Sequence, residues 1–182
     1  MPTELEERMN NINIEEAIQK LNILNTEYPN NIEQQDFMNR IETLLDDKSP
    51  QTKHRYICLH GQGGAGKSVV MSKVSTLVRS KGLLGLDCAQ TNLVANSFEN
   101  CLTAHTLLGY PVIEDGDGND SEEKPDCRPS IERMELLSNA VLINWDEFFS
   151  AAVDHWEAAV RLLKNNTNLI WCFYGDSRQI AP

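Results

Sequence analysis

The stretch GQGGAGKS, residues 61–68, follows an apolar run (RYICLHG, residues 55–61) and precedes a run of helix-forming residues (67–82). A glycine-rich turn between a strand and a helix lets backbone N–H groups face a phosphate chain, and the helix start adds partial positive charge. We therefore expect the loop to bind a nucleoside triphosphate, with Lys67 reaching its β- and γ-phosphates and Ser68 holding Mg²⁺. The positions expected to contact the nucleotide are Gly61, Gly63, Gly64, Ala65, Gly66, Lys67 and Ser68. The alternative is a glycine-rich turn without a ligand, which the match of both pattern and context disfavours.

Strands and helices alternate along the chain. Apolar runs predict strands over residues 55–61, 83–89, 141–147 and 168–176. Helical spacing of apolar residues, helix caps and stop signals predict helices over residues 12–25, 32–46, 67–82, 91–100, 130–140 and 150–166. This alternation indicates an α/β fold with a mostly parallel sheet and helices on both faces. Ligands of such sheets bind beyond the carboxyl ends of the strands, where Gly61, Asp146 and Asp176 fall.

The composition limits the class of protein. The chain has 182 residues, which is enough for one domain with a small appendage, and 41% of them are hydrophobic. No apolar run reaches the length of about 18 residues that a membrane span needs, and the acidic N-terminus lacks the features of a secretory signal. The five cysteines are scattered singly, so we expect free thiols and an intracellular protein without a membrane partner.

Charge is distributed unevenly, with a net value of −11. Residues 51–113, around the glycine loop, carry six basic and two acidic side chains, whereas residues 114–126 carry one basic and seven acidic ones. The net charge therefore does not exclude a nucleic-acid partner for the basic segment. Residues 112–129 are rich in Asp, Glu, Gly and Pro, which predicts a surface loop.

Two carboxylates end the apolar run VLINWDE, residues 141–147. Adjacent carboxylates at the tip of a buried strand are costly unless they bind something. We expect Asp146 to hold Mg²⁺ and Glu147 to orient and deprotonate the attacking water. The alternative is an acidic pair that merely favours the start of the following helix.

A third polar loop, GDSRQ at residues 175–179, follows the last predicted strand. Asp176 is expected to lie beside the nucleotide, and the amide of Gln179 to contact the γ-phosphate and report its presence. A simple polar turn is the alternative interpretation.

The order of these motifs resembles that of the PIF-type DNA helicases of superfamily 1B, and most closely the branch encoded by Helitron transposons. The resemblance covers residues 31–182 and rests on GQGGAGKS (61–68), AQTNLVA (89–95) leading to TAHT (103–106), LINWDE (142–147) and GDSRQIAP (175–182). The segment NNIEQ (30–34) is similar to a family signature whose Gln reads adenine. Gln34 thus has two compatible interpretations, an adenine selector and the third residue of a capping box that begins at Asn31.

The resemblance implies a RecA-like P-loop NTPase domain over residues 31–182, the first motor domain of an ATP-dependent DNA helicase, with a helical appendage over residues 1–30. It implies ATP and Mg²⁺ as cofactors, single-stranded DNA as partner through Thr91, Thr103 and His105, a monomer, and unwinding in the 5′-to-3′ direction. DNA repair, recombination, telomere maintenance or transposition, and a nuclear location, are the associated roles.

Several positions depart from the family pattern. Asn92 stands where the family has Gly, Asn144 stands where an aliphatic residue is expected, and Phe148-Phe149 replace a small residue and proline. A buried Asn without partners costs about 1–3 kcal/mol, so Asn144 favours a diverged copy that binds nucleotide without catalysis. A P-loop signalling ATPase is a further alternative, disfavoured by the TAHT and GDSRQIAP motifs.

The sequence stops just after the GDSRQIAP motif, so we expect a fragment without the second motor domain. That domain would supply an arginine worth about 10³–10⁵ in rate in other NTPases. On this expectation the isolated chain binds Mg–ATP weakly, hydrolyses it very slowly and does not unwind DNA.

Overall fold

The computed structural model describes residues 2–47, 49, 55–111 and 126–179. Its helices are α1 (Glu4–Asn10), α2 (Ile14–Glu27), α3 (Ile32–Asp46), α4 (Lys67–Ser80), α5 (Asn92–Ala95), α6 (Ala104–Leu108), α7 (Ile131–Asn139) and α8 (Val153–Leu162). Its strands are β1 (Arg55–His60), β2 (Gly85–Ala89), β3 (Leu102–Thr103), β4 (Leu142–Asp146) and β5 (Ile170–Gly175), and two 3₁₀ turns are η1 (Phe148–Ser150) and η2 (Ser177–Gln179).

The strands form one parallel sheet in the order β1-β5-β4-β2-β3. β4 and β5 are buried along their whole length, which is typical of central strands covered on both faces. β5 lies between β1 and β4, so the residues after β5 sit between the glycine loop and the Asp146-Glu147 pair. The predicted α/β class and parallel sheet are confirmed.

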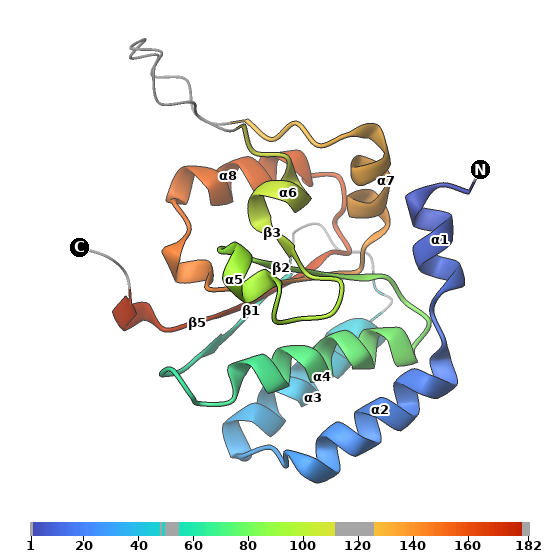
Figure 1. The fold of residues 1–182 in the computed structure, drawn as a ribbon, viewed down its shortest axis with the longest axis vertical. Coiled ribbons are helices and arrows are strands. Elements are labelled where there is room, and N and C mark those ends of the chain that lie inside the picture. Colours follow the sequence, from blue (N-terminus) through green and yellow to red (C-terminus); the bar gives the residue numbers. More distant parts are fainter. Residues whose placement is uncertain (1, 48, 50–54, 112–125, 180–182) are drawn as a thin grey trace.

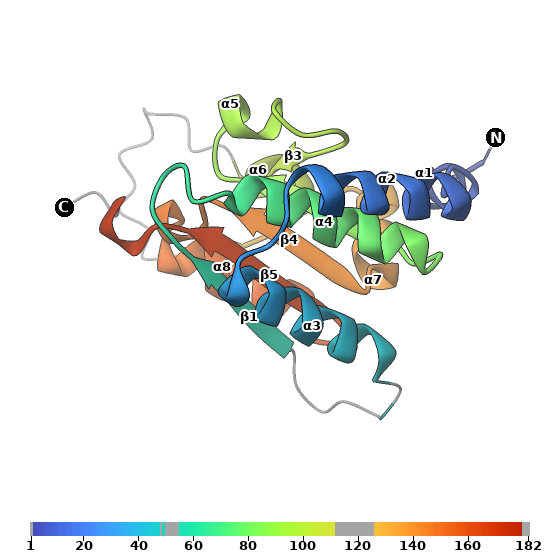
Figure 2. The same ribbon diagram turned by 90° about the horizontal axis from the view of Figure 1, so that it is seen from below.

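Helices cover both faces of the sheet, as Figures 1 and 2 show. One core packs α3 and α4 against one face through residues such as Ile41, Val74 and Tyr174. The other core packs α6, α7 and α8 against the opposite face through Leu108, Leu137 and Trp171. Residues far apart in sequence therefore meet at the carboxyl edge of the sheet, on a base that is buried on both sides. None of the helices in the described ranges has the length and hydropathy of a membrane span.

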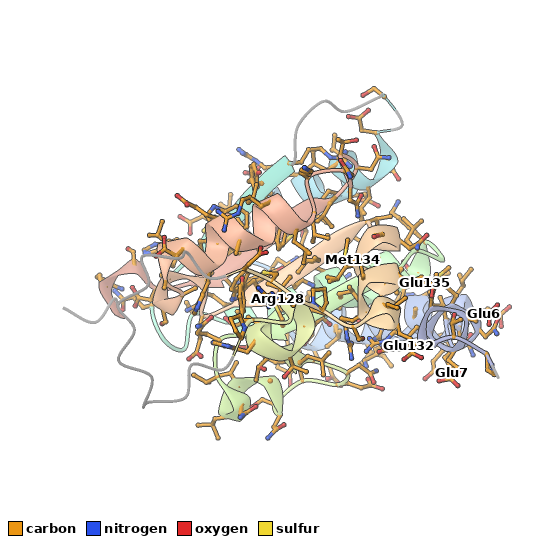
Figure 3. All side chains as sticks on the ribbon, turned by 90° about the horizontal axis from the view of Figure 1, so that it is seen from above. Glu6, Glu7, Arg128, Glu132, Met134 and Glu135 are labelled. Atoms are coloured by element: carbon orange, nitrogen blue, oxygen red, sulfur yellow. The ribbon has the colours of Figure 1, made fainter. Side chains whose placement is uncertain are left out.

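The N-terminal helices pack onto this core. α2 runs along α4, and α1 lies beside α7, where Glu4 pairs with Arg133 at 3.1 Å. Figure 3 labels Glu6 and Glu7 on α1 and Glu132 and Glu135 on α7, so this pair of helices carries acid on both members. α1 itself was not predicted from the sequence, because it buries no side chain and so shows no apolar stripe.

A buried lysine fixes the turn between α2 and α3. Lys73 of α4 is 0% exposed, and its ammonium donates to the Tyr28 carbonyl and to Asn30 Oδ1, at 2.7 Å for the latter. Next to this turn, Asn31 and Gln34 form the predicted capping box at the start of α3. The ammonium thereby holds the entry to α3 against α4, the helix that follows the glycine loop.

Asn144 of β4 finds partners for its amide, although it is 0% exposed. Its Nδ2 donates to Asp87 Oδ1 at 2.7 Å and to Ser75 Oγ at 3.0 Å, and Tyr174 Oη donates to its Oδ1 at 2.9 Å. Asp87 is also the register partner of Asn144 on β2. The amide of Asn144 is therefore paired, so the cost expected of an unpaired buried Asn does not arise at this position.

Other sequence predictions need local correction. The helix expected over residues 91–100 ends at Ala95, and Asn100 has a positive φ of 60°. The helix expected from residue 150 begins at Val153, after η1, and the TAHT region contributes the short strand β3 as well as α6. All five cysteines lie in the described part and are free thiols, as predicted. Most of the predicted surface loop over 112–129 lies outside the described residues.

Candidate functional site

The glycine loop has the backbone that a phosphate-binding turn needs. Gly64 and Gly66 have φ of 77° and 79°, a region that costs other residues about 1–2 kcal/mol. Gly66 is the N-cap of α4, so the helix starts inside the loop and directs its free N–H groups toward it. The base of the loop is tied to the GDSRQ segment (residues 175–179), called motif III from here on, because the Gly61 N–H donates to the Gly175 carbonyl at 3.1 Å.

Lys67 lies across the mouth of this loop. Its ammonium donates to the carbonyls of Gly61 and Gln62 at 2.7 and 2.8 Å. Both are neutral acceptors, and among the described residues no carboxylate is bonded to the ammonium, so its positive charge suits an anion brought to the loop.

Gln34 touches the loop directly, but from outside the cavity. Its Oε1 accepts from the Asn31 N–H at 3.1 Å and its Nε2 donates to the Ala65 carbonyl at 3.0 Å. A Cβ on Gly66 would lie 3.2 Å from the same Nε2. Both ends of the amide are therefore engaged with the helix cap and the loop; its predicted role in reading adenine stays a prediction.

Asp146 ends β4 and is 6% exposed. Burial is the largest effect on this carboxyl, and it raises the pKa; the negative charge of Glu147 raises the pKa further. A hydrogen bond of 2.9 Å from the Glu147 N–H and the positive charge of Lys67 both lower the pKa of Asp146. A cation beside this carboxyl would favour its charged form, so the position suits a ligand of a metal ion.

Glu147 has an unusual backbone, with φ of 55°, in the left-handed region that non-glycine residues rarely adopt. Such conformations cluster at functional sites and cost about 1–3 kcal/mol. Its Oε2 accepts a hydrogen bond of 3.0 Å from Thr91 Oγ1. Thr91 was predicted to face DNA, and its contact with Glu147 was not foreseen from the sequence.

Motif III forms a small charged network behind the loop. Arg178 donates to Asp176 Oδ1 at 3.1 Å, and these side-chain and backbone hydrogen bonds from Arg178 lower the pKa of Asp176. With its amide turned so that the oxygen faces Arg178, Gln62 accepts from the guanidinium at 2.9 and 3.0 Å. His60 Nε2 lies 2.8 Å from Ser177 Oγ. Arg178 thus links motif III to the glycine loop, a role the sequence did not reveal.

Gln179 ends η2, and its side chain lies outside the described part of the structure. Its predicted contact with the γ-phosphate stays a prediction.

These elements surround a cavity of about 620 Å³. Its walls include the loop glycines, Lys67 and Ser68 on one side and the pair Asp146-Glu147 with Asp176 on another. Leu24 of α2 and Tyr28, the residue that caps the end of α2, also line it, so the N-terminal segment contributes to the site. The separation of residues 1–30 as an appendage stays a prediction.

The aromatic pair after Glu147 is accommodated by its surroundings. Phe148 stacks on Phe173 with ring centroids 4.0 Å apart. Phe149 lines the cavity, and a Cβ on Gly175 would come within 2.7 Å of its ring. The bulk at residue 149 is therefore matched by the absence of a side chain at residue 175.

The other residues predicted to face DNA lie at the same edge of the sheet. Thr103 pairs in register with Ala89 at the end of β2, and its hydroxyl caps α6 through the Thr106 N–H at 3.1 Å. His105 packs its ring against those of Tyr110 and His155, with centroids 5.3 and 5.2 Å away.

The PIF1-like helicase family model matches residues 30–182, which is most of the chain. The chain belongs to the PIF1-like helicase family. This match agrees with the family resemblance inferred from the glycine loop, the Asp146-Glu147 pair and motif III. No curated protein gives a significant match.

Solved structures of Pif1 helicases share the fold. A Bacteroides Pif1 helicase in complex with ADP-AlF3 and single-stranded DNA is 21% identical, with a TM-score of 0.59 over 84% of this chain and 33% of that one. A Pif1 structure described for unwinding at forked duplex DNA is 21% identical, with a TM-score of 0.57 over 84% and 35%. The Candida albicans Pif1 helicase is 17% identical, with a TM-score of 0.51 over 84% and 34%. The chain thus spans about a third of the length of the solved chains, whose agreement supports the RecA-like fold.

Proposed function

We propose that this PIF1-like chain is the ATP-binding motor domain of a DNA helicase. The observation that carries the proposal is the convergence of Lys67, Glu147 and Asp176 on one cavity in a chain of this family. The family match, together with the TAHT and GDSRQIAP motifs, favours it over a signalling ATPase.

In the proposed reaction, the glycine loop and Lys67 hold the triphosphate, and Glu147 takes a proton from the attacking water. The free N–H groups of the loop and the Lys67 ammonium stabilise negative charge as it moves onto the leaving phosphate. Asp176, which is held in place by Arg178, lies beside the phosphates of the nucleotide. The amide of Gln179 contacts the terminal phosphate and so reports its presence.

Mg²⁺ fits this arrangement through Ser68 and Asp146. The described residues contain no group of three or more His, Cys, Asp or Glu that could hold a metal alone. Mg²⁺ is usually bound by one or two protein ligands together with substrate phosphates. When bound, it would neutralise charge on the phosphates.

The partner proposed for the carboxyl edge is single-stranded DNA, contacted by Thr91, Thr103 and His105. The order of the sequence motifs supports the Helitron branch as a further part of the proposal. Translocation from 5′ to 3′ and a nuclear location are included as what the family resemblance implies. Repair, recombination, telomere maintenance and transposition are the candidate pathways, and a monomer is the proposed state.

Unwinding requires two parts that move against each other, and the solved chains are about two and a half times as long as this one. We infer that a second motor lobe, with an arginine toward the cavity, completes the site. The polypeptide of residues 1–182 should then bind Mg–ATP weakly and hydrolyse it slowly. Robust strand displacement by this polypeptide would contradict the inference.

The Glu147→Gln variant tests the assignment of the base. It keeps the size of the side chain and an amide oxygen for Thr91 while removing the carboxylate, so nucleotide binding should persist and hydrolysis should fall by about 10²-fold or more. The measurements are binding of a fluorescent ATP analogue and single-turnover hydrolysis, with Glu132→Gln on α7 as a distant control. Equal turnover in wild type and Glu147→Gln would refute the assignment of Glu147 as the base, and ATP binding without any turnover in wild type would favour a nucleotide-binding protein without catalysis.

A further inference from the structure

The hydroxyl of Thr91 and the carboxylate of Glu147 meet because of the register of two neighbouring strands. Ala89 of β2 pairs with Asp146 of β4, and the Gln90 N–H donates to the Asp146 carbonyl at 3.2 Å. Thr91 and Glu147 follow this pair by two residues and by one. The pairing of β2 with β4 therefore holds both residues next to each other, and their side chains form a hydrogen bond of 3.0 Å.

The Thr91 hydroxyl serves two partners at once. It accepts from the Val94 N–H at 3.4 Å, as the N-cap of α5, and it gives its one hydrogen to Glu147 Oε2. A hydroxyl has a single hydrogen, so any second acceptor that takes it must displace Glu147. Since the present acceptor is a carboxylate, an anionic acceptor is the kind that competes.

The bond directs one oxygen of Glu147 away from the cavity. Glu147 lines the cavity, whereas Thr91 is not among its lining residues. This orientation acts against Glu147 as a base while the bond is in place.

We propose that Thr91 is a positioning residue that restrains Glu147, and that a phosphate of single-stranded nucleic acid relieves the restraint by accepting the Thr91 hydrogen. This inference rests on the proposed function. Thr91 is solvent-exposed, so an external phosphate can reach it. ATP hydrolysis is then coupled to the binding of single-stranded nucleic acid through the Thr91 hydroxyl.

The test compares single-turnover ATP hydrolysis of Thr91→Val with that of wild type, with and without oligo-dT. Thr91→Val should hydrolyse about tenfold faster without DNA, the size of one hydrogen bond to a charged group, and should lose most of its stimulation by DNA. Thr91→Ser keeps the hydroxyl and should restore wild-type behaviour. Ser130→Ala, which removes a helix N-cap on α7 remote from Glu147, controls for loss of a cap.

A DNA-free rate in Thr91→Val that equals or falls below that of wild type, with nucleotide binding kept, would overturn the restraint. A second readout does not need turnover: the side-chain carboxyl ¹³C resonance of Glu147 should move in Thr91→Val and return in Thr91→Ser. An unmoved resonance also overturns it. Failure of the wild type to bind Mg–ATP would instead contradict the proposed function.

Discussion

Replacement of Asn144 by leucine tests whether the polar group inside the sheet is an integrated part of the fold. Leucine resembles the aliphatic residue expected at this position of β4. In the structure, however, Asn144 donates to Asp87 and Ser75 and accepts from Tyr174. The substitution leaves the Asp87 carboxylate with one donor fewer and the Tyr174 hydroxyl without its acceptor.

The magnitude follows from these losses. A buried hydroxyl left without a partner costs about 1–3 kcal/mol, and loss of a hydrogen bond to a charged group costs about 1.5–3 kcal/mol. Burial of the apolar leucine side chain returns about 1.5–3 kcal/mol. We therefore expect Asn144→Leu to lower the free energy of unfolding by about 1–3 kcal/mol, a large share of the stability of about 5–15 kcal/mol typical of a domain.

Urea unfolding followed by tryptophan fluorescence measures this loss, because Trp145 and Trp171 are buried in the same sheet. The double variant Asn144→Leu/Tyr174→Phe removes the stranded hydroxyl and should recover about 1 kcal/mol relative to the sum of the single variants. An Asn144→Leu protein as stable as wild type, or more stable, would refute the reasoning and would again favour Asn144 as a drifted residue.

Two further predictions concern the loop and the partly buried His155. Gly66→Ala should weaken binding of an ATP analogue and lower stability more than Gly64→Ala does. Both substitutions add the cost of a side chain at a positive φ. Only the Cβ at residue 66 would also lie close to Gln34, at 3.2 Å, whereas the Cβ at residue 64 would have no neighbour within 4 Å. An equal loss of binding and stability in the two variants would contradict a role for the contact between residue 66 and Gln34. The pKa of His155 is lowered from its ordinary 6.5 by burial and then by the charge of His105, so the unfolded chain takes up this proton at a higher pH than the folded chain. Stability should therefore fall as pH drops below about 6.5, and His155→Phe should flatten that slope in urea unfolding at a series of pH values; an unchanged slope would show that other groups set it.

The sequence predicted most of what the backbone pattern alone determines. The four long strands, the parallel arrangement, and the loop and carboxylates at the strand ends are confirmed, because apolar runs and a glycine-rich turn report burial and φ directly. α1 was not predicted, although Thr3 and Glu6 form a capping box at its start. Apolar spacing reveals only helices that bury one face, and α1 has no fully buried residue. β3 was not predicted because a strand of two residues is too short to show the alternation of apolar and polar side chains that marks a strand.

Contacts between side chains from different elements could not be read from the sequence. The bond between Thr91 and Glu147 depends on the register of β2 and β4, and the link from Arg178 to Gln62 depends on the pairing of β1 with β5. The partners of Asn144 come from α4, β2 and β5. Spacing along the chain fixes none of these, so an isolated polar residue looked like decay when its partners lay elsewhere.

The buried ammonium of Lys73 has a consequence for where a minimal folding unit can begin. The family match starts at residue 30, yet Lys73 depends on the Tyr28 carbonyl and on α2, which covers α4. A deletion to residue 30 would expose the charge to water on one side while leaving a bare apolar helix surface, so the truncated domain should be aggregation-prone and easily proteolysed. We therefore expect the minimal folding unit to reach back at least to Ile14, before the residue at which the family match starts.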